Sequence, residues 1–457
     1  MIERTAKEIA DMTNGTLGDT AYYQKKITGV TTDTRKIEKG QLFVPISGEN
    51  FNGHTFAKAA LEKGAAAVLW SAAEPDPPEH GAVIVVNDTL EALQQLASAY
   101  RKSINPKVVG VTGSNGKTTT KDMIYSILTT EYRVHKTQGN YNNHIGLPLT
   151  ILDMPEETEI AILEMGMSAK GEIDFLTKLA KPDIAVITNI GDSHLLDLGS
   201  RENIADAKFE IANGLSKDGV LIYTGDEPLL ADKVKNVAFA LKSFGENKDN
   251  SYQISEIELG KEGTYFKVRD IEQPFYIPVL GKHNVRNALA AIAAANEFHV
   301  DLSRIAEGLT NLKMTGMRLE MLQMSDGLSI INDAYNASPT SMRAAIDLLQ
   351  GMQGFRKKHL VLGDILELGK DEKMYHEQIG MEIDSSQIQF VYTYGKLGEY
   401  IANGANGNFQ EGCVMHFDDK KALARELQNR TAPEDIVLIK ASRGMKLEDV
   451  ISHLKSS

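Results

Sequence analysis

A glycine-rich loop with one lysine and two threonines is the part of this sequence that most clearly carries chemistry. It reads Gly113-Ser114-Asn115-Gly116-Lys117-Thr118-Thr119, and it stands between an apolar run and a helical pattern. Backbone N–H groups of such a loop, aided by the positive end of the following helix, can surround phosphate oxygens. Lys117 would then reach the β- and γ-phosphates, and the Thr118 hydroxyl would ligate Mg²⁺. The loop predicts an enzyme that consumes ATP here; a Gly-rich turn without a ligand is the alternative.

The glycine spacing departs from the general phosphate-loop pattern. That pattern has a glycine five positions before Gly116, where this chain has Val111, and the glycine here is Gly113. Phosphate loops serve kinases, GTPases, motors and ligases, so other residues must decide the reaction. A GTPase needs a guanine-reading Asn-Lys-x-Asp, and the nearest match, residues 189–192, lacks the lysine. We therefore discount a GTPase.

Two further apolar runs lead to side chains that could hold a metal ion. Residues 160–163 are followed by Glu164, and residues 184–188 lead to His194. Ligands of α/β sheets bind at the carboxyl ends of the strands, so both side chains are expected at that edge. Glu164 is a plausible Mg²⁺ ligand. Taken alone, His194 is more often a hydrogen-bonded structural residue, and Lys208, in a helical pattern, an ordinary solvated lysine.

Composition narrows the classes of protein. The formal net charge of −13 leaves no broad basic surface for a nucleic acid. Cys413 is the only cysteine, which excludes an internal disulfide framework or a Cys-rich zinc site and indicates a reducing compartment. The start of the chain has no signal-peptide pattern, and no run approaches the roughly 20 apolar residues of a membrane span. We expect a soluble, cytoplasmic protein.

Strand-like and helix-like runs alternate almost throughout, which predicts an α/β fold with parallel sheets. The 457 residues suffice for three domains. We expect boundaries near residues 101–107 and 311–317, and hence domains over 1–104, 105–315 and 316–457. The last of these is predicted to be Rossmann-like. Its strands are expected at residues 328–332, 359–362, 390–394 and 436–440.

The motifs together resemble those of the Mur ligases, which build the peptide stem of bacterial peptidoglycan. The resemblance covers the whole chain, and its motifs follow the family's order and approximate spacing. It rests on Thr112–Thr118, Glu164, His194, Lys208, Gly281–Ala288, Arg318 with Glu320, and Asp333.

Three longer motifs resemble those of the family member that joins D-alanyl-D-alanine to UDP-N-acetylmuramoyl-tripeptide. They are Gly139–Pro148, Asp333–Ser341 and Leu362–Gly369. The sister enzyme that adds the third stem residue typically carries an Asn-Pro-Arg motif, which this chain lacks in its last domain. The resemblance thus implies these two substrates, a role in peptidoglycan precursor synthesis, a monomer, and no partnership with nucleic acid or membrane.

The resemblance also implies roles for individual residues. Asn287 and Asp333 would contact adenine and ribose, and Arg318 would reach the phosphates from the interdomain linker. Two Mg²⁺ ions would lie near Thr118, Glu164, His194 and Lys208, with Lys208 carbamylated by CO₂. Residues of the N-terminal domain would hold the UDP end of the substrate: Thr32, Asp33, Thr34, Arg35, Gly48 and His54. Turns around a small sheet are the alternative for each. The remaining candidates for the substrates are Asn142, Asn143, Asn336, Ser442 and Arg443.

Two rival functions stay open at this point. One is another ATP-dependent amino-acid ligase of the superfamily, such as a folylpolyglutamate synthase, which would share the ATP site but not the motif over residues 335–339. The other is a nucleotide-binding regulatory or scaffolding protein without turnover. The split of ATP-site residues across the second boundary also suggests that the site forms only when domains close.

Overall fold

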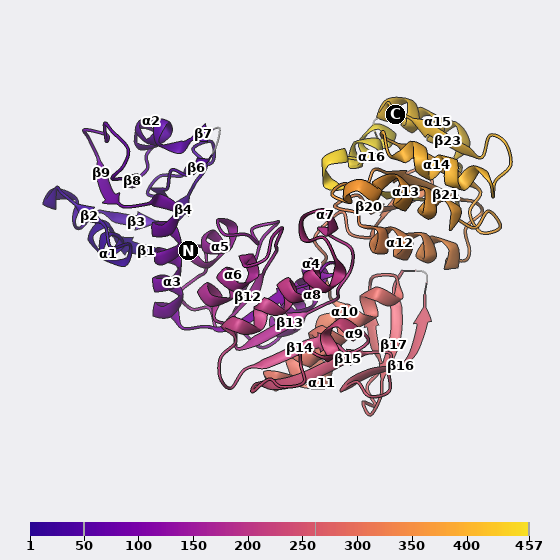
Figure 1. Ribbon diagram of the computed structural model, residues 1–457, viewed down its shortest axis with the longest axis horizontal. Coiled ribbons are helices and arrows are strands. Elements are labelled where there is room, and N and C mark those ends of the chain that lie inside the picture. The colour runs from indigo at the N-terminus through magenta and orange to yellow at the C-terminus, as the bar shows by residue number, and fades with distance from the viewer. Residues whose placement is uncertain (49–50, 261, 456–457) are drawn as a thin grey trace.

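The computed structural model describes residues 1–48, 51–260 and 262–455, and it has three α/β domains (Figure 1). The central domain lies between the other two, each of which is built on its own sheet. The predicted α/β class with three domains is confirmed. No helix among these residues is long and apolar enough to cross a membrane.

The N-terminal domain has a short-stranded mixed sheet. In spatial order its strands are β2 (Thr16–Leu17), β9 (Ala82–Val86), β8 (Ala67–Ser71), β5 (Leu42–Phe43) and β4 (Val30–Thr31). Two small antiparallel pairs accompany it, β1 (Glu3–Thr5) with β3 (Lys26–Thr28), and β6 (Ser47–Gly48) with β7 (Phe51–Asn52). Its helices are α1 (Ala6–Met12), α2 (Ala57–Glu62) and α3 (Thr89–Ile104).

The central domain contains a nine-stranded sheet. In spatial order its strands are β11 (Val134–Lys136), β12 (Ile160–Glu164), β10 (Lys107–Thr112), β13 (Ile184–Ile187), β14 (Val220–Thr224), β15 (Ala240–Gly245), β16 (Tyr252–Leu259), β17 (Thr264–Val268) and β18 (Phe275–Ile277). The expected parallel arrangement holds from β11 to β16, whereas β16, β17 and β18 pair antiparallel. In β17 every second residue is exposed, so one face of this edge lies in solvent, while the other packs against α10 (Lys282–Glu297) and α11 (Leu302–Thr310).

Helices cover both faces of the parallel part of the central sheet. They are α4 (Lys117–Leu128), α5 (Gly146–Leu152), α6 (Glu172–Ala180), α7 (Leu195–Leu198), α8 (Arg201–Phe209), α9 (Pro228–Ala231), α10 (Lys282–Glu297) and α11 (Leu302–Thr310). Alanines fill the buried side of α10, so this helix lies close against α4, the helix that follows the phosphate loop. The core on the other face, with α5, α6 and α8, is continuous with the core of the N-terminal domain.

The C-terminal domain has a six-stranded sheet, parallel except for its first edge strand. Its strands in spatial order are β19 (Glu320–Gln323), β20 (Ser329–Asp333), β24 (Ile436–Lys440), β21 (Lys358–Gly363), β22 (Phe390–Tyr394) and β23 (Val414–Phe417). Its helices are α12 (Pro339–Gly351), α13 (Glu372–Met381), α14 (Gly398–Asn406), α15 (Lys420–Arg430) and α16 (Glu448–Lys455). Separate apolar clusters on the two faces give the doubly covered, Rossmann-like arrangement expected.

Candidate active site

The phosphate loop joins β10 to α4, and two of its glycines are required by geometry. Gly113 has φ +150°, and a Cβ there would lie 1.8 Å from Thr188 Oγ1. Gly116 has φ +80°, and a Cβ there would lie 2.4 Å from Asn287 Oδ1. The loop therefore passes so close to β13 and α10 that no side chain fits at either position. This explains why the glycine stands at position 113.

Residues 189–192, which match a guanine-reading motif only in part, support the phosphate loop. Asn189 Oδ1 accepts a hydrogen bond from the N–H of Asn115 at 2.8 Å, and the N–H of Gly191 donates to Ser114 Oγ at 2.8 Å. Thr188 Oγ1 donates to the carbonyl of Asn115 at 2.5 Å. These bonds come from the neighbouring parallel strand and hold the loop in one shape.

Four candidate residues meet at the start of α4. Lys117 Nζ donates to the carbonyl of Gly113 at 2.8 Å, so its ammonium lies over the loop. Thr118 Oγ1 donates to Glu164 Oε2 at 2.9 Å. Asn142 Nδ2 donates to Glu164 Oε1 at 2.8 Å, so both carboxylate oxygens are held. The hydroxyl and carboxylate predicted to ligate Mg²⁺ are thus adjacent.

His194 and Lys208 lie beside this group. His194 adopts a left-handed backbone conformation, and its Nδ1 is 3.1 Å from Glu367 Oε2 of the C-terminal domain. Burial, and then the charge of Lys117, lower the pKa of His194. The side chain of Lys208 is buried, and among the described residues its ammonium makes no hydrogen bond or ion pair. Burial, and then the charge of Lys117, hold the pKa of Lys208 well below its usual value.

A cavity of about 580 Å³ contains most of the predicted ATP-site residues. Its walls come from the phosphate loop, the ends of β12 and β13, the first turn of α10, the linker to the third domain, and the edge of the C-terminal sheet. The predicted residues that line it are Ser114, Asn115, Gly116, Lys117, Thr118, Thr119, Asn142, Asn143, Glu164, His194, Asn287, Arg318, Asp333 and Asn336. Gly113 and Lys208 are not among the lining residues.

Two cationic side chains of this cavity, Lys117 and Arg318, lie near each other. Burial lowers the pKa of Lys117, Glu164 opposes that effect, and the charge of Arg318 adds to it. The Arg318 guanidinium lies 4.1 Å from the centre of the Tyr335 ring, and its buried Nε has no protein partner. Nδ2 of Asn115 is likewise buried without a partner. Unpaired donors and like charges of this kind call for an anionic ligand rich in oxygen.

The C-terminal side of the cavity is held by an ion pair. Lys440 Nζ, at the end of β24, lies 2.5 Å from Asp333 Oδ2 and donates to the carbonyl of Asn336 at 3.1 Å. Asp333 Oδ1 accepts from the N–H of Leu319 at 3.2 Å. Asp333 therefore connects the sheet edge to the linker that carries Arg318.

The cavity contains oxygen ligands of the kind that Mg²⁺ takes in nucleotide enzymes. No group of three or more His, Cys, Asp or Glu side chains that could hold a metal occurs in residues 1–48, 51–260 and 262–455. Mg²⁺ in nucleotide enzymes is usually held by one or two protein oxygens together with phosphates and water. The Thr118 hydroxyl and the Glu164 carboxylate fit that requirement.

The candidates of the N-terminal domain lie away from this cavity, and none of them lines it. Asp33 and Arg35 form a two-point pair, with Arg35 Nε 2.9 Å from Asp33 Oδ1. His54 is buried; its Nε2 accepts from the N–H of Ser71 at 3.2 Å, so in this conformation it stabilises the domain. Thr32 and Thr34 lie in the loop that carries Asp33 and Arg35, and Gly48 ends β6.

Three other candidates have visible structural roles. Asn143 Oδ1 accepts from the N–H of Gly146 at 2.8 Å and caps α5. Ser442 is buried, and its Oγ accepts from the N–H of Leu366 at 2.9 Å. Arg443 pairs with Glu448 at 2.7 Å, and its guanidinium lies 5.8 Å from the Tyr335 ring centre. Ser442 and Arg443 do not line the cavity.

Several residues without a predicted role also line the cavity, among them His283 and Arg286. Both belong to the motif over residues 281–288, and their position in the first turns of α10 was the available signal. Burial, only partly offset by Asp333, lowers the pKa of His283 to about 4.

A phosphate loop whose cavity is completed by a second α/β domain defines a nucleotide-dependent enzyme with a two-domain site. Family models match three consecutive parts of the chain. They are the Mur ligase family, catalytic domain, at residues 26–101, the Mur ligase middle domain at 111–295, and the Mur ligase, glutamate ligase domain at 317–443. The chain belongs to the Mur ligase family.

Individual relatives extend this likeness over the full length. The chain is 57% identical to the UDP-N-acetylmuramoyl-tripeptide--D-alanyl-D-alanine ligase of Bacillus subtilis (strain 168), over 100% of this chain and 99% of that protein. A crystal structure of MurF from Acinetobacter baumannii superposes with a TM-score of 0.90 at 31% identity, covering 100% of both chains. The MurF ligase of Thermotoga maritima in complex with ADP has a TM-score of 0.82 at 29% identity, covering 94% of this chain and 97% of that one.

Proposed function

We propose that this protein is an ATP-dependent ligase that joins D-alanyl-D-alanine to UDP-N-acetylmuramoyl-tripeptide in peptidoglycan precursor synthesis. The observation that carries the proposal is the single cavity in which Lys117 and Glu164 of the central domain face Arg318 and Asp333. The resemblance of the whole chain to ligases of this name supports the choice of substrates. The rival reading as a regulatory protein without turnover is disfavoured because the charged residues of the site are all present and lie together, apart from Lys208, which is buried beside them.

The chemistry follows from the charges around the cavity. The terminal carboxylate of the tripeptide attacks the γ-phosphorus of ATP, forming an acyl phosphate and releasing ADP. The amine of D-alanyl-D-alanine then adds to the acyl carbon, and phosphate leaves from the tetrahedral intermediate. Negative charge accumulates on phosphoryl oxygens in the first step, and Lys117 and Arg318 are placed to stabilise it. Mg²⁺ held by Thr118 and Glu164 would supply further neutralisation of the phosphates.

Lys208 is suited to becoming a carbamate. An amine must be neutral to add to CO₂, and burial near Lys117 favours the neutral form. The product is an anion, which the neighbouring cation stabilises and which could ligate a second Mg²⁺ together with His194 and Glu164. This gives a buried, unpaired lysine a chemical function.

Domain closure completes the site in this proposal. The N-terminal and central domains share an extensive core, whereas the C-terminal domain meets the central domain through Leu280 and through polar contacts such as Thr340 Oγ1 to Asp192 Oδ2 at 2.9 Å. Such contacts can open and close at little cost. Closure would also exclude water that hydrolyses the acyl phosphate. We place the three domains at residues 1–104, 105–315 and 316–457, and we propose a cytoplasmic monomer that binds neither nucleic acid nor membrane.

The experiment is a substrate panel. The protein is incubated with ATP, Mg²⁺ and UDP-N-acetylmuramoyl-tripeptide that carries either lysine or diaminopimelate as its third residue. Each mixture then receives either D-alanyl-D-alanine or one single amino acid, glutamate included. Phosphate release and product mass are measured. Ligation of D-alanyl-D-alanine alone is expected. Turnover with a single amino acid but not with the dipeptide would assign the chain to another reaction of the family.

A further inference from the structure

Asp122 lies one and a half turns after Lys117 on α4, where it is 1% exposed, and no role in the reaction has yet been given to it. Its Oδ2 accepts two hydrogen bonds from Thr315, at 2.9 Å from the N–H and 2.7 Å from Oγ1. Thr315 belongs to the linker between α11 and β19. The helix that follows the phosphate loop is therefore bonded directly to the segment that leads into the C-terminal domain.

The other oxygen of Asp122 faces two lysines. Oδ1 lies 2.7 Å from Lys136 Nζ and 3.4 Å from Lys121 Nζ. Burial alone would raise the pKa of Asp122, but Lys121 and Lys136 outweigh it and lower that pKa, so the side chain is a carboxylate. Neutralising the lysines thus occupies one oxygen only. The second oxygen accepts the hydrogen bonds of Thr315 in the linker. A residue that served only to balance the charge of the lysines would not need these bonds.

The same cluster reaches the predicted magnesium ligand. Lys121 Nζ donates to the carbonyl of Thr137 at 2.8 Å, and the N–H of Glu164 donates to Thr137 Oγ1 at 3.0 Å. Lys121, Thr137 and Glu164 are all buried. A continuous series of polar contacts therefore runs from the linker, through Asp122, to the end of β12.

Beyond Thr315 the linker is constrained on both sides of Arg318. Met317 and Leu319 have φ of +62° and +51°, a conformation that residues with a Cβ rarely adopt. Glu320 Oε2 accepts from the N–H of Met317 at 3.0 Å, which holds this shape at its start. Arg318 is thus displayed on a short rigid segment, and the Asp122–Thr315 contact ties that segment to the central domain.

We propose that Asp122 and Thr315 form a clamp that fixes the interdomain linker to the phosphate-loop helix and so sets the position of Arg318 relative to Lys117. Both are positioning residues, since neither lines the ATP cavity. The inference rests on the proposed function, because it gives Arg318 its role toward the phosphates of ATP.

The test compares variants that differ by one contact. Thr315→Val removes the hydroxyl at nearly constant volume, and Thr315→Ser keeps it. We expect Thr315→Val to lower kcat/KM for ATP by roughly tenfold or more, as for loss of one hydrogen bond to a charged group. Thr315→Ser should stay within about twofold of the parent protein. Equal losses in both variants, or no loss in Thr315→Val, would overturn the clamp.

A double-mutant cycle separates positioning from general stability. In an Arg318→Ala background, Thr315→Val should cause no further loss of kcat/KM beyond about twofold, because the group that it positions is already gone. A full additional loss in that background means that Thr315 does not act through Arg318, and the inference fails. Ligation by the unaltered protein is measured first, so failure of the proposed function is seen separately.

Discussion

The hydroxyl of Thr118 donates a hydrogen bond to the carboxylate of Glu164 at 2.9 Å, although the two residues lie 46 positions apart in the chain. Thr118 is in the first turn of α4, and Glu164 ends β12, which pairs directly with β10. The amide of Asn142 holds the other carboxylate oxygen. The protein oxygens proposed to bind Mg²⁺ are therefore oriented by the fold itself.

Glu164→Gln should weaken the binding of Mg²⁺ at the active site. The substitution keeps the size of the side chain and removes the negative charge that would face the ion. We expect the Mg²⁺ concentration for half-maximal ligation to rise at least about tenfold, a loss of roughly 1.4 kcal/mol. A magnesium titration of ATP-dependent phosphate release measures this, with the exposed Glu62→Gln on α2, outside the cavity, as the control. An unchanged magnesium requirement would remove Glu164 from the metal site.

Lys117→Met should abolish ligation while leaving the UDP-substrate bound. The apolar chain keeps most of the packing but loses the charge that stabilises the transferred phosphoryl group, so kcat should fall by about 10²-fold to 10³-fold. Steady-state kinetics gives the rate, and calorimetry gives the affinity for UDP-N-acetylmuramoyl-tripeptide. Near-normal turnover in this variant would contradict the whole ATP-site assignment.

Gly113→Ala should destroy nucleotide binding. The added Cβ would lie 1.8 Å from Thr188 Oγ1, so the loop must move away from β13. Gly18→Ala is the matched control, because a Cβ there meets nothing within 4 Å. Binding of a fluorescent ATP analogue should be lost in the first variant and unchanged in the second. Retained binding in Gly113→Ala would mean that the loop tolerates a different shape.

Lys208 should react with CO₂. We expect a carbamate signal in the ¹³C NMR spectrum of the protein equilibrated with ¹³C-bicarbonate, and none in Lys208→Met. Activity should also rise when bicarbonate is added to CO₂-depleted protein, since the neutral amine is the reacting form. If the spectra of parent and variant are the same, Lys208 is an unmodified lysine.

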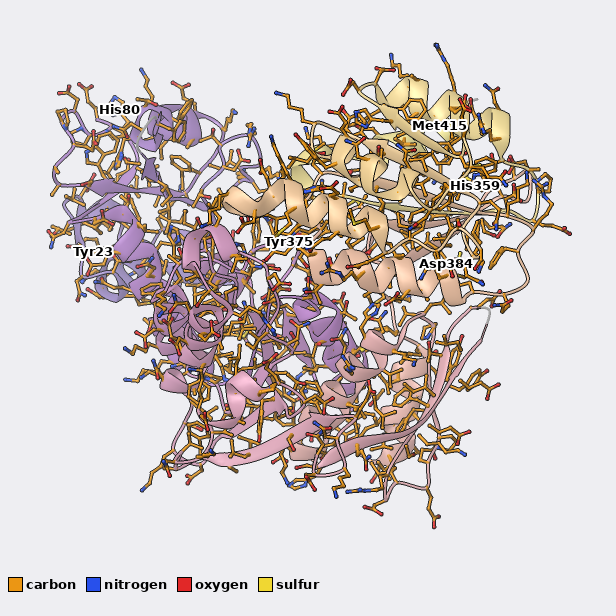
Figure 2. All side chains as sticks on the ribbon, turned by 45° about the vertical axis from the view of Figure 1, so that its right-hand side comes forward. Tyr23, His80, His359, Tyr375, Asp384 and Met415 are labelled. Atoms are coloured by element: carbon orange, nitrogen blue, oxygen red, sulfur yellow. The ribbon has the colours of Figure 1, made fainter. Side chains whose placement is uncertain are left out.

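His359 should make stability fall in mild acid. It is fully buried in the C-terminal domain, where Figure 2 labels it, and burial lowers its pKa from 6.5 to about 4. The folded protein therefore resists its protonation, so its contribution to stability is present above pH 6.5 and is lost as the pH falls toward 4. The loss should approach about 3 kcal/mol over that range. The free energy of unfolding of the C-terminal domain, measured with urea, should depend less on pH in His359→Gln than in the parent protein.

Much of the fold was predictable because local patterns agree with it. The apolar runs at residues 390–394 and 436–440 became β22 and β24 with the expected bounds. The antiparallel strands β16, β17 and β18 were missed, since half-exposed strands have a weak apolar signal. The chain between α3, which ends at Ile104, and β10 has only two residues, and the division of the domains at 104/105 stays a prediction.

By itself, the sequence determined the α/β class, the phosphate loop and the list of candidate residues, because these depend on residue type, local periodicity and short spacings. Only the tertiary structure decided which candidates meet. It brought Arg318 and Asp333 to the cavity of Lys117, left His54 and Arg35 apart from it, and bonded Asp122 to Thr315. Such contacts depend on strand order and domain packing, and these arise from interactions between residues far apart in the chain, which no local pattern records.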